Sequence, residues 1–172
     1  MKDLQWFKEA KYGLMVHFGL YSVLGGVYKG QKSRAYAEWI QATLAIPNGE
    51  MEQIARTFNP IHFDAEEWAR FAVDCGMRYI VITSKHHDGF ALFQSDADDY
   101  NCHDFAPFKR DIIRELSDAC RKYGLKFGVY YSQDLDCHLG ADHLCGRCRW
   151  RQPRHDNQLL RRWLDPGGGN QR

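Results

Sequence analysis

A unit made of a helix followed by a strand occurs twice in this sequence, and this repetition constrains the fold more than any other feature. The first unit opens with the segment 64–67, which resembles an N-terminal capping box, and Gly76 ends its helix. The apolar run 79–83 then has the composition of a buried strand. The helix face that we expect to be buried consists of Trp68, Phe71, Ala72 and Cys75.

The second unit repeats this order of elements closer to the C-terminus. Its helix ends at Gly124, and the run 127–132 forms the expected strand. Gly76 and Gly124, like Ser84 and Ser132, match at a constant offset of 48 residues. The apolar stripe of the second helix contains Phe108, Ile112, Ile113, Leu116, Ala119, Cys120 and Tyr123.

Helices that alternate with strands predict an α/β fold with a parallel sheet, because parallel strands need crossover connections. Strands that are apolar throughout indicate a sheet covered on both faces, and the earlier run 14–18 supplies a third strand. We interpret the strands as the N-terminal portion, about three β/α units, of a (β/α)8 TIM-like barrel, which needs about 250 residues in full. An open doubly wound sheet is the alternative, although no Gly-rich phosphate loop follows any of the strands.

The composition changes sharply after residue 136. Residues 137–172 contain no Lys, Glu, Val, Ile, Phe, Tyr, Met, Ser or Thr, but they contain seven Arg and the glycine run 167–169. Almost nothing in this segment can form a periodic apolar face. We therefore predict a partial barrel over 1–136 and an irregular arginine- and glycine-rich tail over 137–172. A frameshifted or disordered tail is the favoured interpretation, and a genuine divergent tail is the alternative.

Charge and hydropathy exclude several classes of partner. The formal net charge of +1 creates no overall field that would attract nucleic acid or an anionic membrane. No run of 18 apolar residues could span a bilayer, and the N-terminus lacks the apolar core of a signal peptide. We expect a cytoplasmic protein for the sequence as written, or a secreted or periplasmic one if the true N-terminus lies upstream.

The carboxyl ends of the expected strands carry the residues suited to chemistry. His17 ends the first strand, His86 and His87 follow the second, and Tyr130 lies in the third. The segment 37–39 adds a carboxylate and a large ring from Glu38 and Trp39. Such residues suit a sugar, whose hydroxyls need donors and acceptors while its C–H face packs on rings. Each also has a structural interpretation: a core histidine, a solvated helix charge or barrel packing.

Five short motifs resemble the α-L-fucosidases of glycoside hydrolase family 29 in order and spacing. The similarity covers roughly residues 4–136, and the Lys-His-His-Asp-Gly-Phe motif at 85–90 is the most specific. The other four motifs are His17-Phe18-Gly19, Ala37-Glu38-Trp39, Lys109-Arg110-Asp111 and Gly128-Val129-Tyr130-Tyr131-Ser132.

This resemblance implies a retaining exo-glycosidase that releases terminal α-L-fucose from oligosaccharides or glycoconjugates and needs no metal or organic cofactor. It implies a fucose pocket formed by His17, Glu38, Trp39, His86, His87 and Tyr130. Retaining chemistry also needs a nucleophilic carboxylate and an acid/base carboxyl group. The family has both in later strands, so we assign no catalytic residue within this chain and expect the chain alone to be inactive.

Two other interpretations remain open at this point. His17, His86 and His87 could be ligands of a metal-dependent barrel hydrolase, although adjacent residues of one strand point to opposite sides. Alternatively, the chain could be a non-enzymatic fragment. The pair Cys145 and Cys148 resembles half of a zinc site, but no second pair with suitable spacing follows it.

Overall fold

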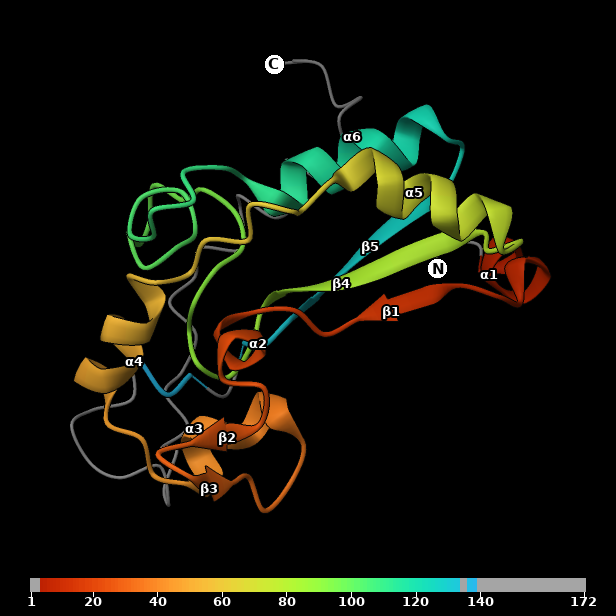
Figure 1. The fold of residues 1–172 in the computed structure, drawn as a ribbon. Coiled ribbons are helices and arrows are strands. Elements are labelled where there is room, and N and C mark those ends of the chain that lie inside the picture. Colours follow the sequence, from red (N-terminus) through yellow and green to blue (C-terminus); the bar gives the residue numbers. More distant parts are fainter. Residues whose placement is uncertain (1–3, 134–135, 139–172) are drawn as a thin grey trace, which may run out of the picture.

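The computed structural model describes residues 4–133 and 136–138 (Figure 1). In chain order, the elements are α1 (Gln5–Ala10), β1 (Leu14–Val16), α2 (Leu20–Leu24), β2 (Val27–Tyr28), β3 (Gln31–Lys32), the 3-10 helix η1 (Ala37–Trp39), α3 (Ile40–Thr43), α4 (Asn48–Ala55), α5 (Ala65–Asp74), β4 (Tyr79–Lys85), α6 (Ile112–Lys122) and β5 (Lys126–Tyr131). No helix in this described part is long and apolar enough to cross a membrane.

Strands β1, β4 and β5 form a parallel sheet in the order β1-β4-β5. Val16 pairs with Ile82, and Ile82 in turn pairs with Val129, so the apolar centres of the strands lie side by side. Helices α5 and α6 form the two crossovers and lie next to each other over one face of the sheet (Figure 1). The prediction of an α/β fold with parallel strands is therefore confirmed.

Helix α5 begins at the predicted cap, and both crossover helices end at the predicted glycines. The Asp64 carboxylate accepts hydrogen bonds from the Glu66 and Glu67 amides, each at 2.9 Å, and this satisfies two N–H groups that lack helical partners. Gly76 and Gly124 follow the helices with φ angles of +77° and +72°, a region that favours glycine. Most of the predicted stripe of α6 is confirmed, since Ile112, Ile113, Leu116, Ala119 and Cys120 are all buried. Phe108 is buried but precedes the helix, and Tyr123 is the partly buried residue at which the helix ends.

The predicted buried face of α5 is partly wrong. Phe71 is 56% exposed and Cys75 is exposed, whereas the buried residues are Ala65, Ala69 and Ala72. One position along a helix is a rotation of about 100°, so a face centred on Ala69 and Ala72 turns Phe71 outward. Cys75 is the residue at which the helix ends rather than a member of its last full turn.

A long insertion between β1 and α5 collects at the carboxyl ends of the strands. It contains α2, the antiparallel hairpin of β2 and β3, η1, α3 and α4 (Figure 1). The chain remains in this region because Leu20, Ile40 and Met51 are buried in the same core as the sheet. The insertion thereby places η1 next to α2 and the strand ends.

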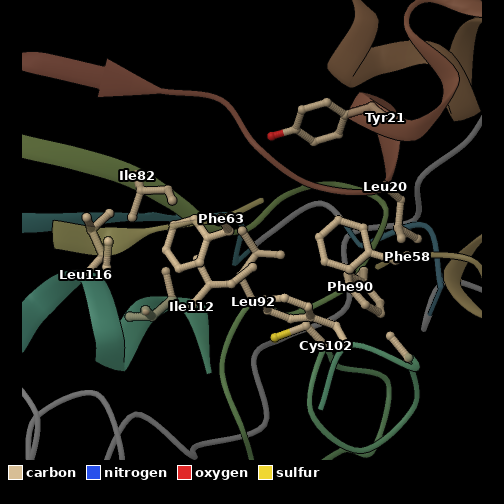
Figure 2. Packing of buried hydrophobic residues seen from close by; sticks show 14 of the residues in the cluster. Leu20, Tyr21, Phe58, Phe63, Ile82, Phe90, Leu92, Cys102, Ile112 and Leu116 are labelled. Atoms are coloured by element: carbon tan, nitrogen blue, oxygen red, sulfur yellow. The ribbon is translucent and has the colours of Figure 1, made fainter. Parts of the chain in front are cut away.

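The core extends from the sheet and its helices into the loop after β4. Ile82, Ile112 and Leu116 fill the space between sheet and helix, and Phe58 and Phe90 continue the core beneath the insertion (Figure 2). The rings of Phe58 and Phe90 lie 5.3 Å apart in an edge-to-face arrangement. The loop that carries the histidine pair is therefore built on a packed base.

Candidate functional site

His86 lies at the centre of a cluster of rings at the carboxyl ends of the three strands. Its imidazole stacks on Tyr130 of β5, with ring centroids 5.5 Å apart and an interplanar angle of 26°. The ring of His17, directly after β1, meets the His86 imidazole edge-on with centroids 5.6 Å apart. The ring of Tyr21 in α2 meets the His86 imidazole in the same way at 5.4 Å. Residues from all three strands and from the insertion therefore converge on one histidine.

Helix η1 brings the remaining predicted residues to this cluster. Trp39 contacts His87 with ring centroids 4.0 Å apart and stands at right angles to His86 at 6.4 Å. Glu38 belongs to the same helix and is half-buried, and its charge acts on the phenol of Tyr21. All six residues predicted for the pocket thus lie at one end of the sheet, and ring contacts join five of them.

Burial divides the cluster into an inner and an outer part. His86 and His87 are 4% and 8% exposed, whereas Tyr130 is 37% exposed and His17 is open to solvent. Burial, together with the neighbouring His87 and His17, lowers the pKa of His86 to about 3, and burial has the largest effect. His86 is therefore neutral at physiological pH, with one ring nitrogen that donates and one that accepts a hydrogen bond.

Asp88 follows the histidine pair but belongs to the interior of the loop. Its carboxylate accepts a hydrogen bond from the Phe90 amide at 3.1 Å, and only 5% of the residue is exposed. Burial, together with the nearby carboxylate of Asp136, raises the pKa of Asp88 to about 7, and burial has the largest effect. Asp88 is thus a supporting residue of the turn and not an open carboxylate at the mouth of the site.

A protein-family model described as alpha-L-fucosidase matches residues 2–163 of the chain. The chain belongs to this family. It is 36% identical over 136 residues to the plasma alpha-L-fucosidase of Homo sapiens and 35% identical over 136 residues to the tissue alpha-L-fucosidase of Rattus norvegicus. Each of these alignments covers 74% of this chain and 29% of the relative, so the chain spans less than a third of their length.

Solved structures of α-L-fucosidases share this fold. The unliganded alpha-L-fucosidase AlfC from Lactobacillus casei is 58% identical, with a TM-score of 0.77 over 78% of this chain and 41% of AlfC. A family 29 fucosidase from Bacteroides thetaiotaomicron is 32% identical, with a TM-score of 0.77 over 96% of this chain and 36% of that protein. The α/β arrangement of residues 4–133 is therefore the arrangement that fucosidases use.

Tyr21 is a residue of the ring cluster that sequence reasoning missed. It is buried against His86, and burial raises the pKa of its phenol, with the charges of Asp88 and Glu38 adding to the effect. Its position four residues after His17, at the start of a short helix, carried no apolar period or carboxylate that would have marked it. The only available signal was its place two residues after the His17-Phe18-Gly19 motif.

Thr83 of β4 connects the end of β1 to this site. Its hydroxyl donates to the Phe18 carbonyl at 2.9 Å and accepts from the Phe18 amide at 3.0 Å. The Tyr21 hydroxyl lies 2.9 Å from the same oxygen and, given the first bond, is the donor. One buried hydroxyl therefore fixes the residue that follows His17 and the ring that supports His86.

We expect Thr83→Val to lower the free energy of unfolding by about 2–4 kcal/mol, because buried groups of Phe18 and Tyr21 would lose their partner. Thr57→Val is the matched control, since the Thr57 hydroxyl bonds only the nearby Ile54 carbonyl and is exposed. We expect less than about 1 kcal/mol for this control. Urea unfolding measures both values, and equal losses in the two variants would contradict the connecting role of Thr83.

The alternative of a metal site gains no support from the part of the chain that is described. Among residues 4–133 and 136–138, no group of three or more His, Cys, Asp or Glu side chains is placed to hold a metal ion. Cys145 and Cys148, the possible half of a zinc site, lie outside the described residues, as does nearly all of the predicted tail.

Proposed function

We propose that the protein to which this chain corresponds is a retaining exo-glycosidase that hydrolyses terminal α-L-fucose from oligosaccharides or glycoconjugates. The observation that carries this proposal is the convergence of His17, Trp39, His87 and Tyr130 on the neutral His86. A neutral imidazole can donate to one sugar hydroxyl and accept from another, and the rings offer a face to C–H groups.

We assign binding of the fucose to His17, Glu38, Trp39, His86, His87 and Tyr130. AlfC, which is 58% identical to this chain, has been solved with α-L-fucose product, and a variant of AlfC has been solved with Fuca(1,6)GlcNAc. These complexes support a fucosylated glycan as the substrate of this family member. The three parallel strands support the further proposal that the sheet is part of a (β/α)8 barrel, whose active sites lie at the carboxyl ends of the strands.

The two catalytic carboxyl groups are proposed to lie outside the described residues. Retaining chemistry needs them about 5–5.5 Å apart, one as nucleophile and one as acid/base. Glu38 is assigned to the sugar, and Asp88 is buried inside its turn with a hydrogen bond from Phe90. A carboxylate buried in this way does not suit an attack on a sugar at the mouth of the site.

A chimera tests the proposed function directly. Residues 4–138 would replace the matching segment of AlfC, and hydrolysis of 4-nitrophenyl α-L-fucoside would be measured beside the β-D-galactoside and α-D-glucoside. We expect turnover of the fucoside alone. A folded chimera that prefers another sugar, or that hydrolyses none of the three, would contradict the assignment of this pocket to fucose.

The 172-residue chain by itself is expected to show no hydrolysis of 4-nitrophenyl α-L-fucoside above the rate without protein. Its pocket residues lack the nucleophile that gives a covalent route to cleavage. Release of nitrophenol over several hours at high protein concentration is the measurement, with AlfC as the positive control. Turnover that disappears on Glu38→Gln or Asp88→Asn would show that a catalytic carboxylate lies within the chain.

A further inference from the structure

The short segment 136–138 lies directly against the loop that carries the histidine pair. The Cys137 amide donates a hydrogen bond of 2.7 Å to the His87 carbonyl. The segment is itself held in place, because the Asn48 side chain donates to the His138 carbonyl at 3.1 Å. The His138 ring also stacks on Tyr100, with centroids 3.9 Å apart and an interplanar angle of 10°.

The Asp136 carboxylate lies close to the histidine loop at two positions, at Lys85 before the pair and at Gly89 after Asp88. It forms an ion pair with the Lys85 ammonium, and the two side chains are only 10% and 13% exposed. On the other side, Gly89 has a φ of +80°, and a Cβ there would lie 2.7 Å from the Asp136 carboxylate. The backbone of His86 and His87 therefore lies between Lys85 and Gly89, and both of these residues are close to the Asp136 carboxylate.

This ion pair is poorly explained as a source of stability. Removing two charges from water costs about as much as their attraction returns, and apolar pairs of similar volume often serve equally well. Fixing a register is the best-attested use of such pairs. Lys85 is suited to that use, because its carbonyl also accepts from the Ser132 amide at 3.0 Å and its ammonium lies 5.0 Å from the centre of the Tyr131 ring.

We propose that Asp136 is a positioning residue, which acts through Lys85 and Gly89 to hold the rings of His86 and His87 in the orientation that meets Tyr130 and Trp39. The consequence for sugar binding rests on the proposed function, whereas the positioning itself does not. Asp136 determines where the two imidazoles stand.

The test uses the 172-residue chain and follows the ring protons of His86 and His87 by NMR. The His86 ring lies against the rings of Tyr130 and Tyr21, so its proton shifts report its position. We expect Asp136→Asn and the double variant Lys85→Met/Asp136→Leu to move these shifts toward the values of an unstructured histidine. The double variant carries no unpaired buried charge and should therefore stay folded. Lys85→Arg, which keeps the charge, is expected to retain most of the wild-type shifts.

Glu115→Gln is the matched control, because it removes the half-exposed ion pair between Arg110 and Glu115 away from the histidine loop. It is expected to leave the shifts unchanged. Folding of every variant is checked by a cooperative thermal melt. Wild-type shifts in the folded double variant would overturn the proposal.

Titration with L-fucose is the second measurement on the same samples. We expect at least tenfold weaker binding in both Asp136 variants and no change in Glu115→Gln. Unchanged affinity together with displaced rings would overturn the link between positioning and sugar recognition. If the wild-type chain fails to bind L-fucose, the proposed function of this pocket is contradicted, and the ring shifts still decide the positioning.

Discussion

In the AlfC chimera, His86→Ala or His87→Ala is expected to lower kcat/KM for the fucoside by about ten- to a hundredfold or more, because each unpaired sugar hydroxyl in a closed pocket costs about 1–3 kcal/mol. Both rings are buried in the cluster with Trp39 and Tyr130, so no side chain can move in freely to replace them.

The controls for this experiment are His62→Ala and His103→Ala. His62 is exposed, and the His103 ring pairs with the neighbouring Asp104 at 2.9 Å. Within the described residues, neither ring takes part in the cluster around His86, and we expect kcat/KM to change less than twofold. Thermal melts of all four variants separate lost recognition from lost folding. Small and equal losses in the four variants would remove the site assignment.

The second large effect concerns the dependence of stability on pH at Asp88. Its pKa is raised from an ordinary value of 3.8 to about 7 by burial, so the folded chain binds more protons here than the unfolded chain between these values. This contribution to stability is complete below pH 3.8 and is lost as pH rises through about 7. Relative to Asp88→Asn, the wild-type chain should therefore lose about 2–3 kcal/mol of unfolding free energy between pH 5 and pH 8.

Urea unfolding of both proteins at the two pH values measures this difference. His86 has the opposite behaviour, since its lowered pKa makes the folded chain bind fewer protons than the unfolded chain from about pH 3 to its ordinary value of 6.5. The pH dependence of stability that arises from His86 is the same in the wild-type chain and in Asp88→Asn, so it cancels when the two are compared. Asp118→Asn, at an exposed position, is the control. A wild-type curve parallel to that of Asp88→Asn would mean that the carboxyl group is ionised in the folded state at both pH values.

The repeated units predicted the sheet well because their signals are local. An apolar run bounded by a glycine and polar residues depends on a few neighbouring positions, and β4 and β5 lie where such runs occur. The buried face of α6 was predicted well because large apolar residues mark it. The buried face of α5 consists of alanines, which give a weaker apolar signal than Phe71, so the predicted face was placed wrongly on Phe71. Small residues at a helix contact can be recognised only once the partner helix is known.

The site was predictable where residues stand at strand ends and unpredictable where contacts are distant. His17, His86 and Tyr130 follow from the parallel sheet, because its carboxyl ends meet at one edge. The bonds of Thr83 to Phe18 span 65 positions, and the ion pair of Lys85 with Asp136 spans 51. No short pattern encodes such pairs, so Thr83 and Asp136 emerge only from the folded arrangement.

The contact between segment 136–138 and the histidine loop also sets the order in which the site can be assembled during synthesis. A nascent chain grows from its N-terminus at about 5–20 residues per second, so His17 and Trp39 exist seconds before the segment that secures His87. A nascent chain that has emerged from the ribosome only as far as the loop after β4 therefore contains His17, Trp39 and His87 but not yet the segment 136–138. Until Asp136 has been synthesised, Lys85 lacks the carboxylate with which it pairs in the folded chain.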